Sequence, residues 1–512
     1  MPLKIAFIGA GSIGFTRTLV RDILSVPAMS DSQLAFTDIS QQNLDMVSQL
    51  VQRDITANGV KATLRSTTNR RDALKGANYV FNVTRIGGLD AFKLDIEIPL
   101  RYGVDQCVGD TICAGGIMYA QRGVQAILEF CKDISEVAAP NCLFLNYSNP
   151  MAMLTWAANK YGYGVRTVGL CHGVQGGHWQ ISKALGLDSK DVDIICAGIN
   201  HQTWYIQVKV KGEDVTGKLL EAFEKHPDYR ETEKVRIDML RRFGYYSTES
   251  NGHLSEYVPW YRKRPKEIKQ WIDMRSWILG ETGGYLRVCT EGRSWFKTDF
   301  PNWIKQPPLE YKAEKRGHEH GSYILEGLET GKVYRGHFNV VNRGVITNLP
   351  PDCIIEAPGY VDRNGMSMPV VGDLPLGCAA VCNASIQVQR MGVEAAVHGD
   401  DKLLRQAMMM DPLTGAVCNP PEIWQMVDDF LIEQAEWLPQ YKDATARAKK
   451  TRATTKRLPT QDNNQGAARL KIKSVAEMKK NRAEATKNAA AADKGMDRTK
   501  KAGKKSNGVA VH

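Results

Sequence analysis

The chain has 512 residues, a formal net charge of +11 and 43% hydrophobic residues. This composition excludes the collagen-like, coiled-coil and disulfide-scaffold classes. The charge is uneven, because residues 447–512 hold 19 basic and 5 acidic side chains, which leaves a net charge of −3 for residues 1–446.

The first part of the chain alternates short apolar segments with helical ones. Strands are predicted at residues 4–8, 34–37, 79–83, 142–146 and 167–171. Helices are predicted at residues 15–25, after a cap at Ser40, at 123–137 and at 151–160. This alternation is typical of a parallel sheet covered by helices on both faces. We therefore predict an α/β fold with a Rossmann-like doubly wound parallel sheet over residues 1–197.

The pattern changes after residue 197 to longer helical and irregular stretches, including an amphipathic helix near residues 422–436. We expect a second, mixed α+β substrate-binding lobe over residues 198–446. Residues 447–512 contain no Trp, Tyr, Phe or Cys. Such a segment buries too little apolar surface to offset its ordering entropy, so we expect a basic tail that is disordered or transiently helical.

The N-terminal sequence, the hydropathy and the cysteines indicate where in the cell the protein is expected and whether it binds a membrane. The N-terminus runs directly into a strand without a signal peptide, and no apolar stretch is long enough to cross a bilayer. Eleven cysteines without CxxC pairs indicate reduced thiols. We therefore expect a cytoplasmic protein that binds no membrane. Nucleic acid is a hypothesis for the tail only, and an appended segment without function is the alternative.

A dinucleotide fingerprint follows the first strand. Gly9, Gly11 and Gly14 form GxGxxG at the start of a helix. Gly9 allows the tight turn, Gly11 the approach of the pyrophosphate, and Gly14 close packing of helix and strand. Asp38 ends the second strand, where its carboxylate would accept from the ribose hydroxyls and repel a 2′-phosphate. The sequence therefore predicts an NAD site.

Further polar motifs occur at predicted strand and turn ends. They are Val108-Gly109-Asp110-Thr111, Asn146-Tyr147-Ser148-Asn149-Pro150, Gly169-Leu170-Cys171-His172-Gly173, Gly198-Ile199-Asn200-His201 and Asn342-Arg343-Gly344-Val345-Ile346-Thr347-Asn348-Leu349-Pro350. In this order, together with the fingerprint, they resemble glycoside hydrolase family 4, the NAD- and divalent-metal-dependent glycosidases. The resemblance runs from about residue 4 to residue 441.

Cys171 and His201 offer a thiolate and an imidazole that could hold one divalent ion and leave positions open for substrate oxygens. Ligand softness alone suggests zinc. The resemblance implies that these two residues are the metal ligands and that manganese, or another divalent metal, is the ion. The alternative is a buried thiol and a core histidine.

The resemblance also implies the reaction. NAD takes a hydride from C3 of the sugar, the ketone acidifies the C2 proton, the aglycone leaves by elimination, water adds, and the hydride returns. His172 occupies the family position of the acid that protonates the leaving oxygen. Asn149 matches a residue that binds the sugar, and Asp110 is a second candidate for substrate binding.

The base that removes the C2 proton is placed in the segment from Glu249 to Tyr257. Family members use a tyrosine, so Tyr257 is predicted, with His253 as its rival. Packing is the alternative role for this tyrosine, which stands beside Val258-Pro259-Trp260.

Within the family the chain looks most like the α-galactosidases that act on unphosphorylated sugars of the melibiose type. An α-galacturonidase or phospho-glycosidase of the same family is the first alternative, and a 2-hydroxy-acid dehydrogenase is the second. The family resemblance implies a homo-oligomer, a dimer or tetramer. The segment Thr111-Ile112-Cys113-Ala114-Gly115-Gly116 departs from the family pattern, which usually has Gly-Pro before the two glycines.

Overall fold

The computed structural model describes residues 2–273, 277–461 and 466–487. One large sheet runs through it, in the order β10-β8-β7-β12-β11-β6-β5-β4-β1-β2-β3. The six strands from β3 to β6 are parallel. They are β1 (Lys4–Ile8), β2 (Gln33–Thr37), β3 (Thr63–Thr67), β4 (Tyr79–Asn82), β5 (Leu143–Asn146) and β6 (Arg166–Gly169). The order β3-β2-β1-β4-β5-β6 is that of the dinucleotide-binding doubly wound fold, so the predicted fold class is confirmed.

The other half of the sheet is antiparallel and continues the first half through the pairing of β11 with β6. Its strands are β7 (Val192–Ile199), β8 (Gln202–Val210), β9 (Glu213–Asp214), β10 (Tyr246–Ser247), β11 (Tyr334–Val341), β12 (Ile354–Asp362) and β13 (Gly365–Ser367). The boundary expected at residue 197 falls inside β7, and the main compact unit combines residues up to Leu286 with Gln306–Leu470. The sheet itself is therefore not divided where the sequence pattern changes.

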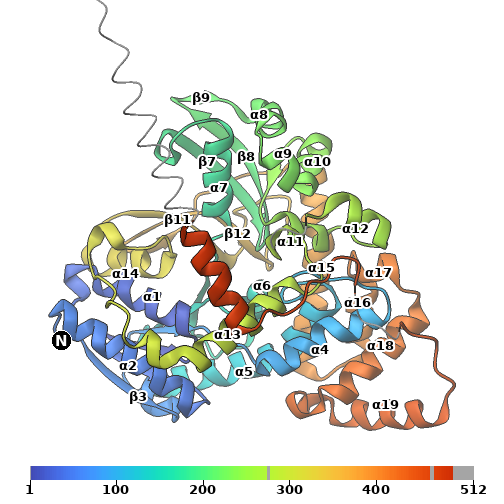
Figure 1. Ribbon diagram of the computed structural model, residues 1–512, viewed down its shortest axis with the longest axis horizontal. Helices are drawn as coiled ribbons and strands as arrows, with labels where there is room; N and C mark the ends of the chain where they lie inside the picture. Colours follow the sequence, from blue (N-terminus) through green and yellow to red (C-terminus); the bar gives the residue numbers. More distant parts are fainter. Residues whose placement is uncertain (1, 274–276, 462–465, 488–512) are drawn as a thin grey trace, which may run out of the picture. The chain divides into compact units, whose positions relative to one another are not determined.

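Helices cover both faces of this sheet (Figure 1). The α-helices of the described residues are α1 (Ile13–Leu24), α2 (Gln41–Asn58), α3 (Arg70–Leu74), α4 (Gly88–Arg101), α5 (Cys113–Val137), α6 (Met151–Tyr161), α7 (Gly173–Ala184), α8 (Leu219–Lys225), α9 (Tyr229–Thr232), α10 (Lys234–Phe243), α11 (Asn251–Tyr257), α12 (Pro265–Trp271), α13 (Gly284–Trp303), α14 (His320–Thr330), α15 (Leu376–His398), α16 (Asp401–Met410), α17 (Thr414–Val417), α18 (Pro420–Glu433) and α19 (Lys442–Thr454). Over the described residues, none of these helices has the length and apolar character needed to span a membrane.

Strand β1 shows how the two faces are filled. Ile5 and Phe7 pack in one core with α1 and α2, whereas Ala6 and Ile8 pack in another with α5 and α6. Successive side chains of a strand point to opposite faces, so a strand between two helical layers needs apolar residues at every position. This explains why continuous apolar runs predicted five of the six parallel strands, whereas the partly exposed edge strand β3, with the sequence TLRST, was not predicted.

The predicted strands lie within two residues of the observed ones. Ser40 caps α2, as predicted, by accepting the Asn43 N–H at 3.3 Å. The helix predicted at residues 123–137 instead begins at Cys113. Its glycines resemble a turn in the sequence, but they serve close packing: a Cβ on Gly115 would lie 2.5 Å from the Asp95 carbonyl oxygen of α4.

The basic tail differs from the expectation over the residues that are described. Helix α19 crosses residue 447 and continues to Thr454. Arg457 then donates to Asp429 Oδ2 of α18 at 2.7 Å, and the Gln461 N–H donates to the Arg101 carbonyl at 2.8 Å. Ion pairs and hydrogen bonds to the preceding part of the chain thus order this segment of the tail. The tail has too few apolar residues for its order to be predicted from composition. Residues 488–512 lie outside the described residues.

A second compact unit joins residues 287–305 to the later part of the tail, described to residue 487. Within it the Lys473 N–H donates to Glu291, and Lys479 pairs with Asp299, each at 2.7 Å. Arg482 lies over the ring of Trp295 at 5.7 Å. Here too, basic tail residues contact acidic and aromatic side chains of a helix.

A buried ion pair between α4 and α5 supports a stability prediction. Arg122 Nη2 lies 2.6 Å from Asp95 Oδ2, with both side chains 1% exposed. Replacing Asp95 with Ala leaves this guanidinium without its counter-charge, so the free energy of unfolding should fall by about 3–5 kcal/mol. Urea unfolding followed by circular dichroism measures it. Lys93→Ala, in an exposed pair with Glu97, is the control and should cost less than about 1 kcal/mol; equal losses would contradict the prediction.

Candidate active site

The loop after β1 is a tight turn that only glycine can make. Gly9 has a φ of +84°, and a Cβ there would lie 2.9 Å from the Cα of Thr84, beyond the end of β4. The Gly9 N–H donates to the Thr37 carbonyl at 2.9 Å. Asp38 follows β2, and its Oδ2 accepts the N–H of Gly11 at 2.9 Å. The predicted residues Gly9, Gly11 and Asp38 thus meet at the carboxyl ends of β1 and β2.

Gly14 lies in the first turn of α1. A Cβ at this position would meet no atom within 4 Å, so the close helix–strand packing predicted for Gly14 is wrong. The first-turn N–H groups of a helix have no partner inside it and favour an anion. The open space at Gly14, this helix terminus and the carboxylate of Asp38 fit the pyrophosphate and ribose of a dinucleotide.

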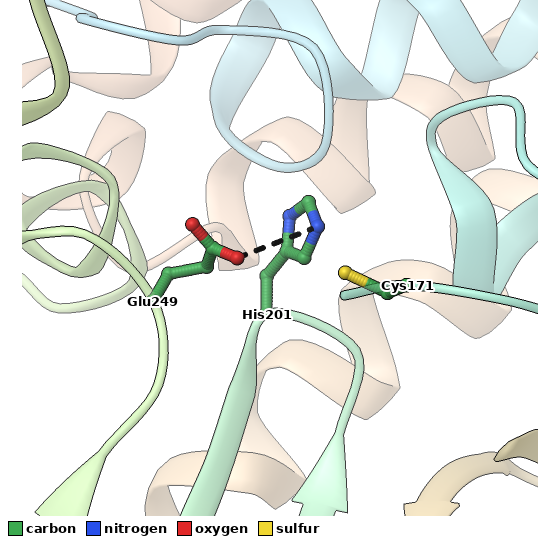
Figure 2. Close-up of side chains that lie close together, drawn as sticks. All are labelled: Cys171, His201 and Glu249. Atoms are coloured by element: carbon green, nitrogen blue, oxygen red, sulfur yellow. Dashed lines mark ion pairs between the residues drawn. The ribbon is translucent and has the colours of Figure 1, made fainter. Parts of the chain in front are cut away.

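Three potential metal ligands converge beyond the ends of strands from both halves of the sheet (Figure 2). Cys171 follows β6, His201 lies in the turn between β7 and β8 with a φ of +61°, and Glu249 follows β10. Their ligand atoms all lie within 4.8 Å of one another. The dashed line of Figure 2 joins His201 Nε2 to Glu249 Oε1, at 4.0 Å. The structure therefore brings together the predicted pair and adds a carboxylate.

The electrostatics of this cluster favour a cation. Burial lowers the pKa of His201 to about 4, so its imidazole is neutral at neutral pH and can act as a ligand. Burial, with Glu356 and Glu249 nearby, raises the pKa of the Cys171 thiol well above its ordinary value. A divalent ion offsets this effect, because it stabilises a coordinated thiolate. The sulfur, nitrogen and oxygen donors thus fit a divalent metal.

Sequence reasoning missed Glu249 as a ligand. Burial would raise the pKa of this carboxyl, but neighbouring histidines, His172 among them, and the Ser250 N–H outweigh burial and lower the pKa, so Glu249 is charged. Its distance in sequence from Cys171 and His201 matches no metal-binding motif. Only the pairing of β10 with β8 brings it close to these two residues. The one signal in the sequence that could have indicated this ligand is that Glu249 is an acidic residue at the start of the family motif from Glu249 to Tyr257.

His172 lies directly before α7 and has a carboxylate partner that the sequence did not reveal. Its Nδ1 is 3.3 Å from Glu319 Oε1, and its side chain is 70% exposed. The Glu319 carboxylate raises the pKa of His172 to about 9. An imidazole that keeps its proton at neutral pH and reaches solvent can donate it to a leaving oxygen.

Asp110 and Asn149 lie together, with Asp110 fully buried. Asp110 Oδ1 accepts the Asn149 amide at 3.2 Å and the Thr111 hydroxyl at 2.9 Å, and its Oδ2 accepts from Arg85 at 3.1 Å. All of these donors converge on one carboxylate. Asp110 is therefore placed to orient Asn149, whereas the half-buried Asn149 is the one placed to meet a ligand.

The two candidate bases are both buried on α11. Tyr257 is 1% exposed, and its hydroxyl donates to the Asn200 carbonyl, next to His201, at 3.2 Å. Its ring packs edge-on against His253, with centroids 5.4 Å apart. His253 has hydrogen-bond partners at both ring nitrogens, His201 and Glu256. Tyr257 thus lies beside the metal-ligand cluster, and His253 is fully engaged.

Comparison with known proteins agrees with this geometry. Residues 4–187 match the family described as Family 4 glycosyl hydrolase, and residues 196–414 match the Family 4 glycosyl hydrolase C-terminal domain. An alpha-galactosidase of Rhizobium meliloti (strain 1021) is 56% identical over 93% of this chain and 97% of its own length. An alpha-galactosidase of Bacillus subtilis (strain 168) is 33% identical over 86% of this chain and 100% of its own. Enzymes named alpha-galacturonidase are 24% to 27% identical.

The fold also matches a solved structure. The 6-phospho-beta glucosidase of Thermotoga maritima, solved with manganese, NAD+ and glucose-6-phosphate, superposes with a TM-score of 0.69 at 23% identity and covers 85% of this chain and 98% of that one. Both halves of the chain match the family, and a relative along nearly its whole length shares more than half of its residues. The chain therefore belongs to the family 4 glycosyl hydrolases.

Proposed function

We propose that the protein is an α-galactosidase that hydrolyses terminal α-D-galactosides of the melibiose type and requires NAD+ and Mn²⁺ or another divalent metal. The observation that carries the proposal is the cluster of Cys171, His201 and Glu249 in the same sheet as a dinucleotide loop. The 56% identity to an alpha-galactosidase supports the choice of sugar, and the NAD+ and manganese named for the Thermotoga enzyme support the cofactors.

Separate groups of residues would bind the nucleotide, the metal and the sugar. Gly9, Gly11 and Asp38 would hold the nucleotide, and the Cys171 cluster would hold the metal. When bound, NAD+ supplies a reversible hydride acceptor and the divalent ion a Lewis acid for the sugar oxygens. Asn149 offers its side-chain amide to a sugar hydroxyl.

Two side chains would move the protons. His172 holds one that it can give to the glycosidic oxygen as the C1–O bond breaks. Tyr257 is proposed as the base that takes the proton from C2, which is acidic while C3 is a ketone. Its hydroxyl lies next to the metal-ligand residue His201, where the charge of a bound divalent ion would offset the burial that raises the pKa of Tyr257. Tyr257→Phe should therefore slow exchange of the C2 proton with solvent.

The charges around His172 favour a neutral sugar over a galacturonide. Glu319 and Glu249 act electrostatically on His172 as carboxylates, whereas burial raises the pKa of Glu356 to about 8 and leaves it uncharged at neutral pH. A uronic carboxylate placed among these acids would be repelled, whereas a primary hydroxyl would not. The acidic surroundings therefore favour the α-galactosidase over its nearest alternative.

A panel of nitrophenyl glycosides tests the proposal. With NAD+ and Mn²⁺ under reducing conditions, we expect cleavage of the α-galactoside to exceed that of the α-glucoside and the α-galacturonide. Galacturonide as the best substrate would overturn the choice of sugar. Undiminished activity after chelation and removal of nucleotide would overturn the cofactors, and stoichiometric accumulation of NADH would indicate a dehydrogenase.

The fingerprint loop gives a prediction for nucleotide binding. Gly9→Ala forces a Cβ against the Thr84 backbone at a positive φ, so the Kd for NAD+ should rise by about 10- to 100-fold. Gly59→Ala is the matched control, because Gly59 has a φ of +63° but no atom within 4 Å of an added Cβ. Fluorescence titration measures both, and equal Kd values for the two variants would contradict the prediction.

We further propose a cytoplasmic homo-oligomer, a dimer or tetramer, that binds neither membrane nor nucleic acid through its catalytic body. Eleven free thiols suit a reducing compartment. Exposed Tyr360, Val370 and Leu376, at 43%, 71% and 84%, offer apolar surface to a second copy. Light scattering after size exclusion tests the assembly, and a monomer at micromolar concentration would contradict it.

A further inference from the structure

The metal-facing histidine is held from behind by a buried chain of hydrogen bonds. His201 Nδ1 lies 2.9 Å from His253 Nε2, and His253 Nδ1 lies 2.6 Å from Glu256 Oε2. His253 is 2% exposed and Glu256 is fully buried. The other oxygen of Glu256, Oε1, accepts the backbone N–H groups of Cys107, Val108 and Gly109 at 2.6, 3.1 and 3.2 Å.

The direction of the chain follows from what each atom can do. Three N–H donors on one oxygen stabilise Glu256 as a carboxylate, which can only accept. His253 Nδ1 must then carry a hydrogen. When His201 holds a divalent ion through Nε2, its own hydrogen is on Nδ1, so the His253 Nε2 that faces it is the acceptor. His201 Nδ1 donates to this acceptor, which leaves the lone pair of His201 Nε2 on the side of Glu249.

We propose that Glu256 and His253 are positioning residues that fix His201 in its Nδ1–H tautomer and thereby set the affinity for the divalent metal. The inference rests on the proposed ligands Cys171, His201 and Glu249. Groups that hold a metal-binding imidazole typically change metal affinity by 10- to 100-fold when removed. Because both nitrogens of His253 are used in the chain, His253 is not the base that removes the C2 proton.

The first test removes the nearer of two acceptors for His201, since His201 Nδ1 also lies 3.3 Å from the Thr111 hydroxyl. His253→Leu should raise the Kd for Mn²⁺ by about 10- to 100-fold, whereas His253→Gln, whose amide oxygen can still accept from His201, should raise it by less than about tenfold. Titration of Mn²⁺ followed by electron paramagnetic resonance of the free ion measures this without substrate. His178→Gln is the matched control, because His178 Nε2 donates to the Val192 backbone carbonyl instead of contacting a proposed metal ligand.

Glu256→Gln keeps the size of the side chain and tests the direction of the chain. If its amide oxygen keeps the three backbone N–H groups, its NH₂ group faces His253 Nδ1 and favours the opposite tautomer. His253 would then donate to His201 Nδ1 and leave the hydrogen on the metal-facing nitrogen. Glu256→Gln should therefore weaken Mn²⁺ binding about as much as His253→Leu, with the Kd for NAD+ within about twofold of wild type.

The outcomes separate this inference from the ligand assignment. Mn²⁺ affinity within twofold of wild type in His253→Leu and Glu256→Gln, with binding lost in His201→Ala, would overturn the relay and leave the ligands in place. Normal binding in His201→Ala would overturn the ligands and the relay together. Equal weakening in His253→Leu and His253→Gln would show that the acceptor is not what matters, which also overturns the relay. The two Gln variants keep the test valid if His253→Leu does not fold.

Discussion

Cys171→Ser is expected to lower kcat/KM for an aryl α-galactoside by about a thousandfold, equivalent to about 4 kcal/mol of transition-state stabilisation. A serine hydroxyl does not ionise as a thiol does when it meets a divalent ion, so the cluster with His201 and Glu249 loses its soft anionic ligand. Initial rates at saturating NAD+, measured across a range of Mn²⁺ concentrations, test this. The Mn²⁺ requirement should rise together with the loss of activity.

Cys142→Ser is the matched control, because Cys142 is a buried thiol outside the ligand cluster. It should retain activity within about threefold of wild type if only packing is affected. Equal losses in the two variants would show that the effect of Cys171→Ser is structural. Full activity in Cys171→Ser at low Mn²⁺ would remove the thiol from the metal site.

His172→Asn is expected to slow melibiose hydrolysis by about 100- to 10,000-fold, the usual contribution of a general acid. An alkoxide is a poor leaving group without a proton, whereas nitrophenolate leaves readily without one. Hydrolysis of nitrophenyl α-galactoside should therefore fall by less than about tenfold. A comparison of kcat for the two substrates measures the difference, and an equal loss for both would contradict the acid role.

The pH dependence follows from the same side chain. The Glu319 carboxylate raises the pKa of His172 to about 9, above its usual 6.5, so the imidazole keeps its proton through neutral pH. Melibiose hydrolysis should therefore hold up to about pH 9 and fall above it. Glu319→Gln removes the charge that raises the pKa, so the fall should move to lower pH. A basic limb that stays in place would separate Glu319 from the acid.

The dinucleotide half could be predicted from the sequence because its signals are local. Buried parallel strands appear as unbroken apolar runs, and the turn at Gly9 is encoded in adjacent residues. The motif placed Gly14 correctly in the first turn of the helix after β1. Its predicted role in close helix–strand packing was wrong, because an added Cβ would meet no atom within 4 Å. Helix α5 begins ten residues before its predicted start, because Gly115 lies against α4 and Gly116 against the Thr111 backbone instead of forming a turn.

The metal-ligand cluster and its support depend on long-range pairing. Cys171 and His201 could be named from the family motifs, but Glu249 reaches them only through β10, and Glu319 reaches His172 only from the segment before α14. No spacing rule joins these residues. Order in the tail after residue 447 had the same cause, because Asp429 on α18 is the partner that holds Arg457.

We propose that the glycosidic bond breaks after oxidation at C3 and loss of the C2 proton, and not by direct displacement. Hydrolysis of melibiose in D₂O, with NAD+ and Mn²⁺, tests it through the galactose that is released, analysed by NMR before product accumulates. The released galactose should carry deuterium at C2, because the proton taken by the base is replaced from solvent. Galactose that retains its C2 hydrogen in full would contradict it.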